Sequence, residues 1–338
     1  MEHQAQEILN QAMELGEQLR TDRRTLHQNP EVGPCLPQTK EYIKKRLTEM
    51  GYVPREICES GIVAEITGKE TGRCILLRAD MDALRVTERT ELPFRAENGA
   101  MLLGAAQLLR RRREQLNGTV KLVFQPDEEG FTGAKTMLAA GVLRVPEPQA
   151  ALALHVNSGT PSGMVLCGRG TFMAGCTLFR ITVRGVGCHG AMPETGVDPI
   201  SIAAHICLAL QEIPAREVAA KTPVVVTVGR LSGGQAPNII PQEAVIEGTI
   251  RTFDREVTAR VMERIEAIAE HTAAAFRGSA ETEELSSAPP LVNDPALMDR
   301  VIDWAGQLLG GNMVYPLNEG GMGSEDFASY TYELPCAY

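Results

Sequence analysis

One stretch, CILLRADMDAL at residues 74–84, decides the fold. Its first half is a continuous apolar run, which is typical of a β-strand that is covered on both faces. Two acids, Asp80 and Asp82, stand shortly after this run, behind Arg78 and Ala79. Because α/β proteins place their ligands at the carboxyl ends of parallel strands, the stretch predicts a central strand over 74–79 that leads into a polar site.

Working outward from this strand, apolar strands and amphipathic helices alternate. Arg110–Arg113 end one of the helices, where cations suit the helix dipole. The alternation predicts an α/β fold with a mainly parallel sheet and helices on both faces. Strands are expected at 62–66, 120–125 and 150–156, helices at 8–27, 43–50, 101–113, 133–140 and 298–309, and a turn-rich loop at 87–99.

After about residue 176 the order changes. Strands are expected at 177–184, 223–229 and 243–251, with helices that begin at Asp198-Pro199 and at Arg255. This β-α-β-β-α order predicts a smaller α+β unit of the ferredoxin type. Ser286–Pro290 is interpreted as the linker out of it. We therefore expect one domain (1–176 and 289–338) that is interrupted by a second domain (177–288).

Composition excludes several classes of protein. The 338 residues are 43% hydrophobic and 22% charged, which is typical of a folded globular chain. The net charge of -10 argues against nucleic acid or an anionic membrane as partner. Apolar runs stay shorter than a membrane span needs, and no secretory signal is visible. The eight cysteines form no regular pattern, which favours reduced thiols and a cytoplasmic location.

Three strand ends carry residues suited to catalysis or metal binding. An apolar strand ends in Asp127-Glu128-Glu129, where adjacent carboxylates can divide metal binding and proton transfer. An acidic helix start is the alternative reading. His155 lies at the end of another apolar strand and suits a metal ligand, although buried structural histidines are common. Cys188-His189 suggests a thiol nucleophile only weakly, because sequence neighbours rarely have the geometry of a dyad.

Together the motifs resemble a known family. RADMDAL, FQPDEEG, LHV, GCHGAMP with VDPI, QAPNIIP, GTIRTF and GSEDF occur in this order from about residue 20 to the last residue. They are similar to those of the di-metal amidohydrolases of the aminoacylase and carboxypeptidase type. The branch that hydrolyses N-acyl and indole-acetyl amino acids shows the strongest resemblance.

The resemblance implies roles for particular residues and partners for the chain. Glu128 matches the general base, Glu129 and His155 match metal ligands, and His189, Asn238 and Arg251 match substrate-binding residues of a lid domain that often dimerises. It implies two divalent metal ions (zinc, manganese, nickel or cobalt) and a small N-acyl amino acid or related amide as substrate. It leaves a homodimer through the lid domain open.

The sequence also departs from the family pattern. Family members carry a Cys-Gly-His-Asp-x-His run where Glu97-Asn98-Gly99-Ala100 here passes directly into Met101. A C-terminal segment with a further histidine ligand is also expected from the family and is not among the 338 residues. Two functions therefore stay open: a metal-dependent amidohydrolase, or a catalytically silent relative or truncated gene product that acts at most as a binding or dimerising protein.

Overall fold

The computed structural model describes residues 2–84, 99–318 and 320–338, so the loop expected at 87–99 lies, apart from Gly99, outside the described residues. The chain divides into two compact units. Unit 1 comprises Met1–Phe172, Leu291–Gly320 and Glu325–Tyr338, and unit 2 comprises Met173–Pro290 and Gly321–Ser324.

Unit 1 is built on a six-stranded sheet in the order β1-β2-β4-β3-β5-β16. Its central strand β3 runs parallel to β4 on one side and to β5 on the other, and β16 is parallel to β5. The other edge, β4-β2-β1, is antiparallel. The strands are β1 (Arg55–Ile57), β2 (Gly61–Thr67), β3 (Glu70–Asp80), β4 (Asn117–Gln125), β5 (Ala150–Ala153) and β16 (Cys336–Ala337).

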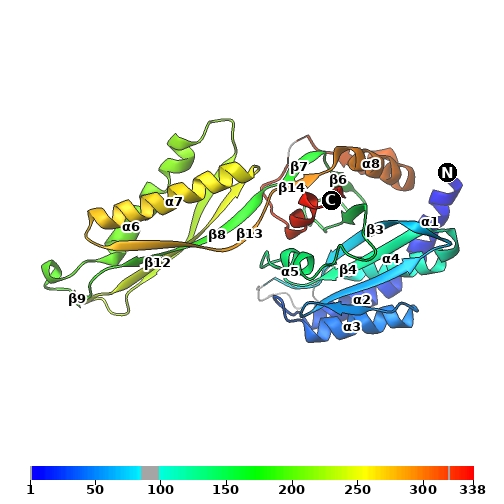
Figure 1. The fold of residues 1–338 in the computed structure, drawn as a ribbon, viewed down its shortest axis with the longest axis horizontal. Coiled ribbons are helices and arrows are strands. Elements are labelled where there is room, and N and C mark those ends of the chain that lie inside the picture. The colour runs from blue at the N-terminus through cyan, green and yellow to red at the C-terminus, as the bar shows by residue number, and fades with distance from the viewer. Residues whose placement is uncertain (1, 85–98, 319) are drawn as a thin grey trace. The chain divides into compact units, whose positions relative to one another are not determined.

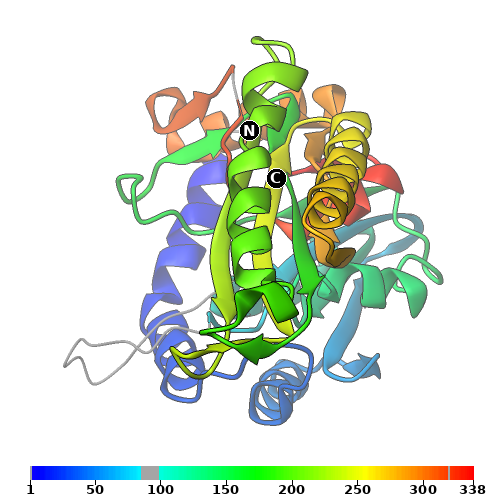
Figure 2. The same cartoon turned by 90° about the vertical axis from the view of Figure 1, so that its left-hand side faces the viewer.

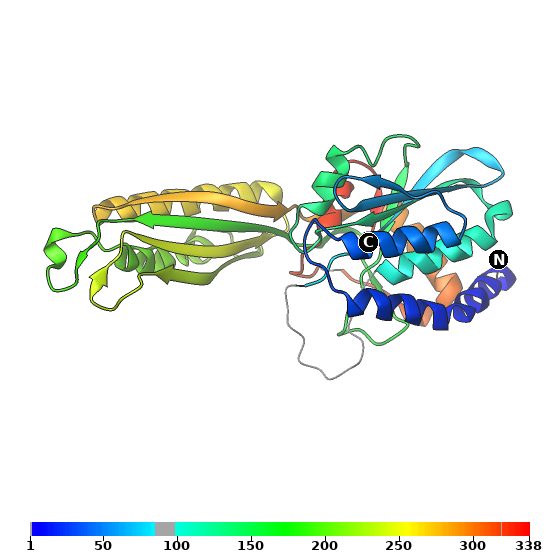
Figure 3. The ribbon, with the colours of Figure 1, turned by 90° about the horizontal axis from the view of Figure 1, so that it is seen from below.

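Helices and short strands complete unit 1. Figures 1 and 3 show α2, α3 and α4 side by side on one face of the sheet, where α3 and α4 enclose an apolar core with the strands. The helices are α1 (Glu2–Glu14), α2 (Gly16–Gln28), α3 (Pro37–Glu49), α4 (Gly99–Arg111), α5 (Gly133–Ala139), α8 (Pro295–Leu309) and the 3₁₀ segment η5 (Asp326–Tyr332). The short strands are β6 (Val165–Cys167), β7 (Gly170–Met173), β14 (Leu291–Asn293) and β15 (Val314–Pro316).

The decisive stretch forms β3 as predicted. Leu76 and Ala79 face opposite sides of the sheet and are both buried. The expected N-terminal helix is instead two helices that are separated at Leu15. Strand β5 ends at Ala153, so His155 lies two residues beyond the strand.

Unit 2 has a four-stranded antiparallel sheet in the order β10-β12-β8-β13. Figures 1 and 2 show α6 and α7 beside these strands, and both helices share one apolar core with the sheet. The elements are β8 (Gly175–Arg184), β9 (Cys188–His189), α6 (Pro199–Ala209), β10 (Val224–Gly233), β11 (Ile239–Ile240), β12 (Glu243–Thr252), α7 (Arg255–Ala275) and β13 (Ser279–Ala288).

The helix starts in unit 2 follow their capping residues. Asp198 accepts a hydrogen bond from the Ile200 N–H, and Pro199 occupies the first helical position of α6. Asp254 caps α7 by accepting from the N–H groups of Glu256 and Val257. One prediction in this unit is wrong. Ser286–Ala288, interpreted as linker, belong to β13, an edge strand that pairs with β8. Its alternate residues are exposed, which is why it lacks the apolar signal of a strand.

The predicted fold class is confirmed: a mainly parallel sheet with helices is interrupted by a smaller α+β unit. Strands and helices of unit 2 follow one another as β8-α6-β10-β12-α7-β13, which adds one strand to the predicted order. Within the described part of the chain, every helix is too short or too polar to cross a bilayer.

His27 near the end of α2 makes the stability of the fold depend on pH. Burial, helped by the positive charge of Arg23, lowers the pKa of His27 to about 4. The unfolded chain therefore takes up this proton near pH 6.5, whereas the folded chain takes it up only near pH 4. Stability should fall as the pH drops through this window.

We expect wild type to lose up to about 2 kcal/mol more unfolding free energy than His27→Gln between pH 7 and pH 5, since glutamine does not titrate. Urea unfolding of both proteins at the two pH values measures this difference. Equal losses in the two proteins would show that His27 does not cause the dependence.

Candidate active site

The carboxyl ends of β3 and β4 are joined by hydrogen bonds to Asp82. Its Oδ1 accepts from the backbone N–H of Glu128 at 2.9 Å, and its Oδ2 accepts from that of Glu129 at 3.3 Å. Burial raises the pKa of Asp82 to about 7, although these backbone donors oppose the shift. The second acid after β3 therefore positions the backbone of the two glutamates after β4.

The backbone around the glutamates is conformationally special. Asp127 and Phe131 both have φ near 56°, in the left-handed region that non-glycine residues rarely adopt. The Thr132 hydroxyl donates to the Asp127 carboxylate and fastens the turn. Glu128 and Glu129 thus lie in a tight connection between β4 and α5, where Glu128 is buried and Glu129 is exposed.

Arg78 organises the buried side of the site. Its side chain is fully buried, and its Nη2 lies 2.7 Å from Oδ1 of Asp326 and 3.0 Å from Oε1 of Glu325. The guanidinium also donates through Nε to Gln125 at 3.1 Å, and its Nη1 lies 3.4 Å from Asp80. Strand β3 therefore holds the GSEDF segment, which lies almost 250 residues later in the chain, to the centre of the sheet.

Glu325 and Asp326 have most of their acceptor capacity filled by protein donors. Asp326 accepts hydrogen bonds from Arg78 and from the Ala134 N–H at 2.8 Å. The Gln125 side-chain amide nitrogen also lies 2.7 Å from Oδ1 and 2.8 Å from Oδ2 of Asp326. Glu325 accepts from the Phe327 N–H at 3.1 Å and from the Tyr338 hydroxyl at 3.1 Å. These two acids serve first to neutralise and hold Arg78.

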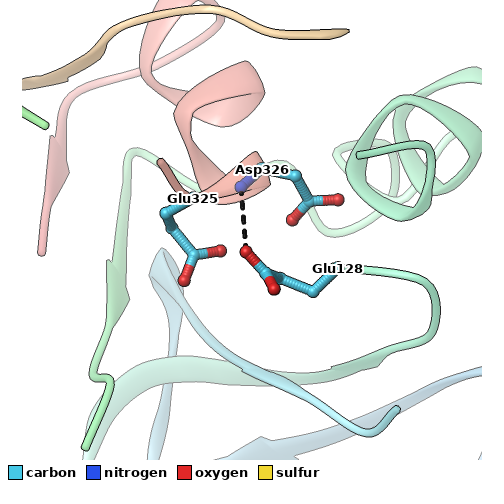
Figure 4. A group of neighbouring side chains, drawn as sticks. All are labelled: Glu128, Glu325 and Asp326. Atoms are coloured by element: carbon cyan, nitrogen blue, oxygen red, sulfur yellow. Dashed lines mark hydrogen bonds between the residues drawn. The ribbon is translucent and has the colours of Figure 1, made fainter. Parts of the chain in front are cut away.

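Glu128 faces this pair of acids (Figure 4). One carboxylate oxygen from each of Glu128, Glu325 and Asp326 lies within 4.8 Å of the other two, and the Asp326 N–H approaches Oε1 of Glu128 at 3.4 Å. Burial, together with the negative charges of Glu325 and Asp326, raises the pKa of Glu128 to about 10. Burial alone would also raise the pKa of Glu325, but Arg78 and His155 outweigh it and lower that pKa to about 2.

His155 adjoins the same cluster from the end of β5. Its Nδ1 lies 3.4 Å from Oε2 of Glu325, and its side chain is 36% exposed. The contact with Glu325, which outweighs the effect of burial, raises the pKa of His155. Because Nδ1 is the ring nitrogen beside the carboxylate, Nε2 is the nitrogen left for a ligand.

The other predicted site residues belong to unit 2. His189 in β9 pairs with Ile239 in β11, and Asn238 directly precedes β11, where its carbonyl accepts from the Gly190 N–H at 2.8 Å. Both side chains are exposed. Arg251 lies on β12 and donates to the Met322 carbonyl at 2.9 Å and to the Ser324 hydroxyl at 3.0 Å.

Sequence reasoning missed Arg78, Gln125 and the acidic pair Glu325-Asp326 as parts of the site. The signal for Arg78 was a charge at the end of an otherwise apolar strand, which requires partners when it is buried. The signal for the acids was that they lie in a stretch, residues 301–338, that contains no basic residue to pair with them.

The donors fit a divalent metal ion. Glu128 and Glu129 offer carboxylate oxygens, and His155 offers an imidazole whose second nitrogen faces a carboxylate, the arrangement that metal-bound histidines usually have. Oxygen and imidazole donors together suit zinc and manganese-type ions. A mainly parallel sheet with such donors and a buried glutamate at its carboxyl edge is typical of metal-dependent hydrolases.

Comparison with known proteins agrees. The profile of "Peptidase family M20/M25/M40" matches residues 76–338. An N-acetyl-L-cysteine deacetylase from Bacillus subtilis is 37% identical over 96% of this chain and 80% of its own length. An IAA-amino acid hydrolase from Arabidopsis thaliana is 36% identical over 93% of this chain and 74% of its own length.

A solved structure agrees as well. A dinuclear metal-binding peptidase of the M20 family from Bacillus subtilis superposes with a TM-score of 0.74 at 32% identity, over 95% of this chain and 87% of the other. This chain belongs to the M20 peptidase family, whose members include hydrolases of carbon–nitrogen bonds. The resemblance inferred from the motifs is confirmed.

Replacing Arg78 with methionine should strongly destabilise unit 1. The substitution keeps much of the side-chain volume but leaves Glu325 and Asp326 without their shared cation, and removing one partner of a buried ion pair typically costs about 3–5 kcal/mol. Urea unfolding measures the loss.

Arg180→Met is the matched control, because Arg180 also contacts two glutamates but is partly exposed on unit 2. Exposed pairs of this kind contribute little, so this variant should unfold almost as wild type does. Similar losses in both variants would contradict the assigned role of Arg78.

Proposed function

We propose that this chain is a metal-dependent amidohydrolase that cleaves the amide bond of N-acyl amino acids or related small amides. The observation that carries the proposal is the placement of Glu128: a buried carboxyl group at the carboxyl end of β4, beside Glu129 and on the same sheet edge as His155. Such a group, close to a bound cation, is suited to accept and return a proton.

Glu129 and His155 would hold the metal ion, as the donor chemistry and the motif positions support. When bound, a divalent ion supplies positive charge that polarises a carbonyl group and acidifies water. The same charge offsets the negative neighbours of Glu128 and favours its ionised form. Zinc, manganese, nickel and cobalt are the candidates, and two ions are expected from the dinuclear M20 relative.

The proposed chemistry places Glu128 at both proton transfers. Its carboxylate accepts a proton from the attacking water as the new carbon–oxygen bond forms at the amide carbonyl. The same proton then passes to the amide nitrogen as the carbon–nitrogen bond breaks, so that a carboxylic acid and a free amine leave. Asp82 keeps the Glu128 backbone in place through its hydrogen bond during these steps.

The substrate class follows from the relatives. Their names describe deacetylation of N-acetylcysteine and hydrolysis of indole-acetyl amino acids, so amino acids with a small or aromatic acyl group are the first compounds to test. We further propose that His189, Asn238 and Arg251 of unit 2 bind the substrate carbonyl or carboxylate. A homodimer formed through unit 2 is part of the same proposal.

The second candidate is a catalytically silent relative. The direct passage from Gly99-Ala100 into Met101, where the family carries a Cys-Gly-His-Asp-x-His run, favours it. In that case the chain would act at most as a binding or dimerising protein.

Bound metal and chelator-sensitive hydrolysis decide between the two candidates. After exposure to manganese or zinc and removal of excess metal, we expect elemental analysis to find retained metal and the protein to hydrolyse N-acetyl and indole-acetyl amino acids. Chelator should abolish the hydrolysis, and added metal should restore it. A folded protein that retains no metal and releases no amine would establish the silent relative instead.

Two neighbouring glutamates should respond differently to removal of their charge. Glu128→Gln removes the proton acceptor, so kcat/KM should fall about 10²–10⁴-fold while metal is retained. Glu129→Gln removes a metal ligand and should lower retained metal together with activity. Steady-state kinetics and elemental analysis on both variants check this, and a Glu129→Gln protein with full metal and full activity would contradict the assignment.

A further inference from the structure

Glu325 is fixed in position more firmly than any role in neutralising Arg78 requires. Oε1 is held by Arg78 at 3.0 Å and by the Phe327 N–H at 3.1 Å, where Glu325 is the N-cap of η5. Oε2 is held by the Tyr338 hydroxyl at 3.1 Å. Both oxygens of this fully buried carboxylate are therefore set in space by donors from three separate parts of unit 1.

His155 has the opposite character. It lies two residues beyond the end of β5, outside the hydrogen-bond ladder, and its side chain is partly exposed. Its Nδ1 faces Oε2 of Glu325 at 3.4 Å, the same oxygen that Tyr338 fixes. A rigid acceptor thus stands next to one ring nitrogen of a histidine that the strand itself does not hold.

We propose that Glu325 is a positioning residue: its carboxylate accepts the Nδ1–H of His155, which fixes the tautomer and the ring so that Nε2 is the nitrogen presented to a metal ion. This inference rests on the proposed function only in taking His155 as a ligand. Carboxylates that orient metal-bound histidines in this way commonly set metal affinity by 10–100-fold. Arg78 acts one step further back, because it holds the other oxygen of the carboxylate.

The alternative is that Glu325 serves only the fold through Arg78. The two roles predict different results for the tautomer of His155. A positioning carboxylate selects one tautomer, whereas an acid that only supports the fold does not. In the metal-free full-length protein, at a pH high enough for the NMR spectrum to show a neutral imidazole, we expect ¹⁵N-edited NMR of the ring nitrogens to show the Nδ1–H tautomer. His155→Asn assigns the signal. An Nε2–H tautomer in wild type overturns the proposal without any variant.

Glu325→Gln tests the same point with a change in affinity. We expect His155 to lose its single tautomer and the affinity for zinc or manganese, measured by calorimetry, to fall about 10–100-fold. Tyr338→Phe keeps the carboxylate and its contact with Arg78 but removes one hydrogen bond, so it should keep the Nδ1–H tautomer. Glu283→Gln, which removes a surface partner of Arg180 in unit 2, should change neither quantity.

A folded Glu325→Gln protein with unchanged tautomer and metal affinity would overturn the proposal. So would a Tyr338→Phe protein that loses the tautomer as completely as Glu325→Gln, because general loosening would then explain both. Neither readout needs hydrolysis. If wild type binds metal but cleaves no amide, the proposed hydrolase function is wrong. The role of Glu325 is then still decided by the NMR and calorimetry results.

Discussion

The buried guanidinium of Arg78 is the interaction on which the rest of unit 1 depends. Desolvating such a charge is costly, and the cost is balanced only when its hydrogen-bonding groups meet well-placed acceptors. Here the acceptors come from β3 itself, from Gln125 on β4 and from the Glu325-Asp326 pair. A single residue therefore ties two parallel strands to a segment that the chain reaches only after completing unit 2.

The same contacts that hold the fold also place the chemistry. One carboxylate oxygen of Glu325 contacts Arg78, and the other lies beside Nδ1 of His155. The backbone N–H of Asp326 donates to the Glu128 carboxylate. The carboxyl edges of β3, β4 and β5 are thereby brought together by side chains as well as by the sheet. Loss of Arg78 would disturb Glu128 and His155 together, because both contact the acids that Arg78 holds.

Much of the fold could be predicted from local signals, and the failures have physical causes. The apolar run at 74–77 identified the central strand because both of its faces are shielded, and Asp198-Pro199 identified a helix start because capping is local. Strand β13 was not predicted, because its glutamates alternate with small residues rather than with large apolar ones. Arg78 and its acids could not be paired from sequence, since burial of a charge and contact over almost 250 residues leave no local pattern. The roles of Glu128, Glu129 and His155 came from their positions at strand ends and from the family resemblance, and they remain predictions.

Charge balance explains why this edge of the sheet favours a cation. Asp80, Glu128, Glu325 and Asp326 are all buried, and Arg78 is the buried cation that they share among the described residues. The acids thus outnumber the positive charges that the fold places among them. Arg78 does not balance all of them: burial and the neighbouring negative charges raise the pKa of Glu128 to about 10 and that of Asp326 to about 8. Either a proton or a metal ion has to supply the missing positive charge. A divalent ion carries more charge than a proton, so the excess of buried acids at this edge of the sheet favours binding of such an ion.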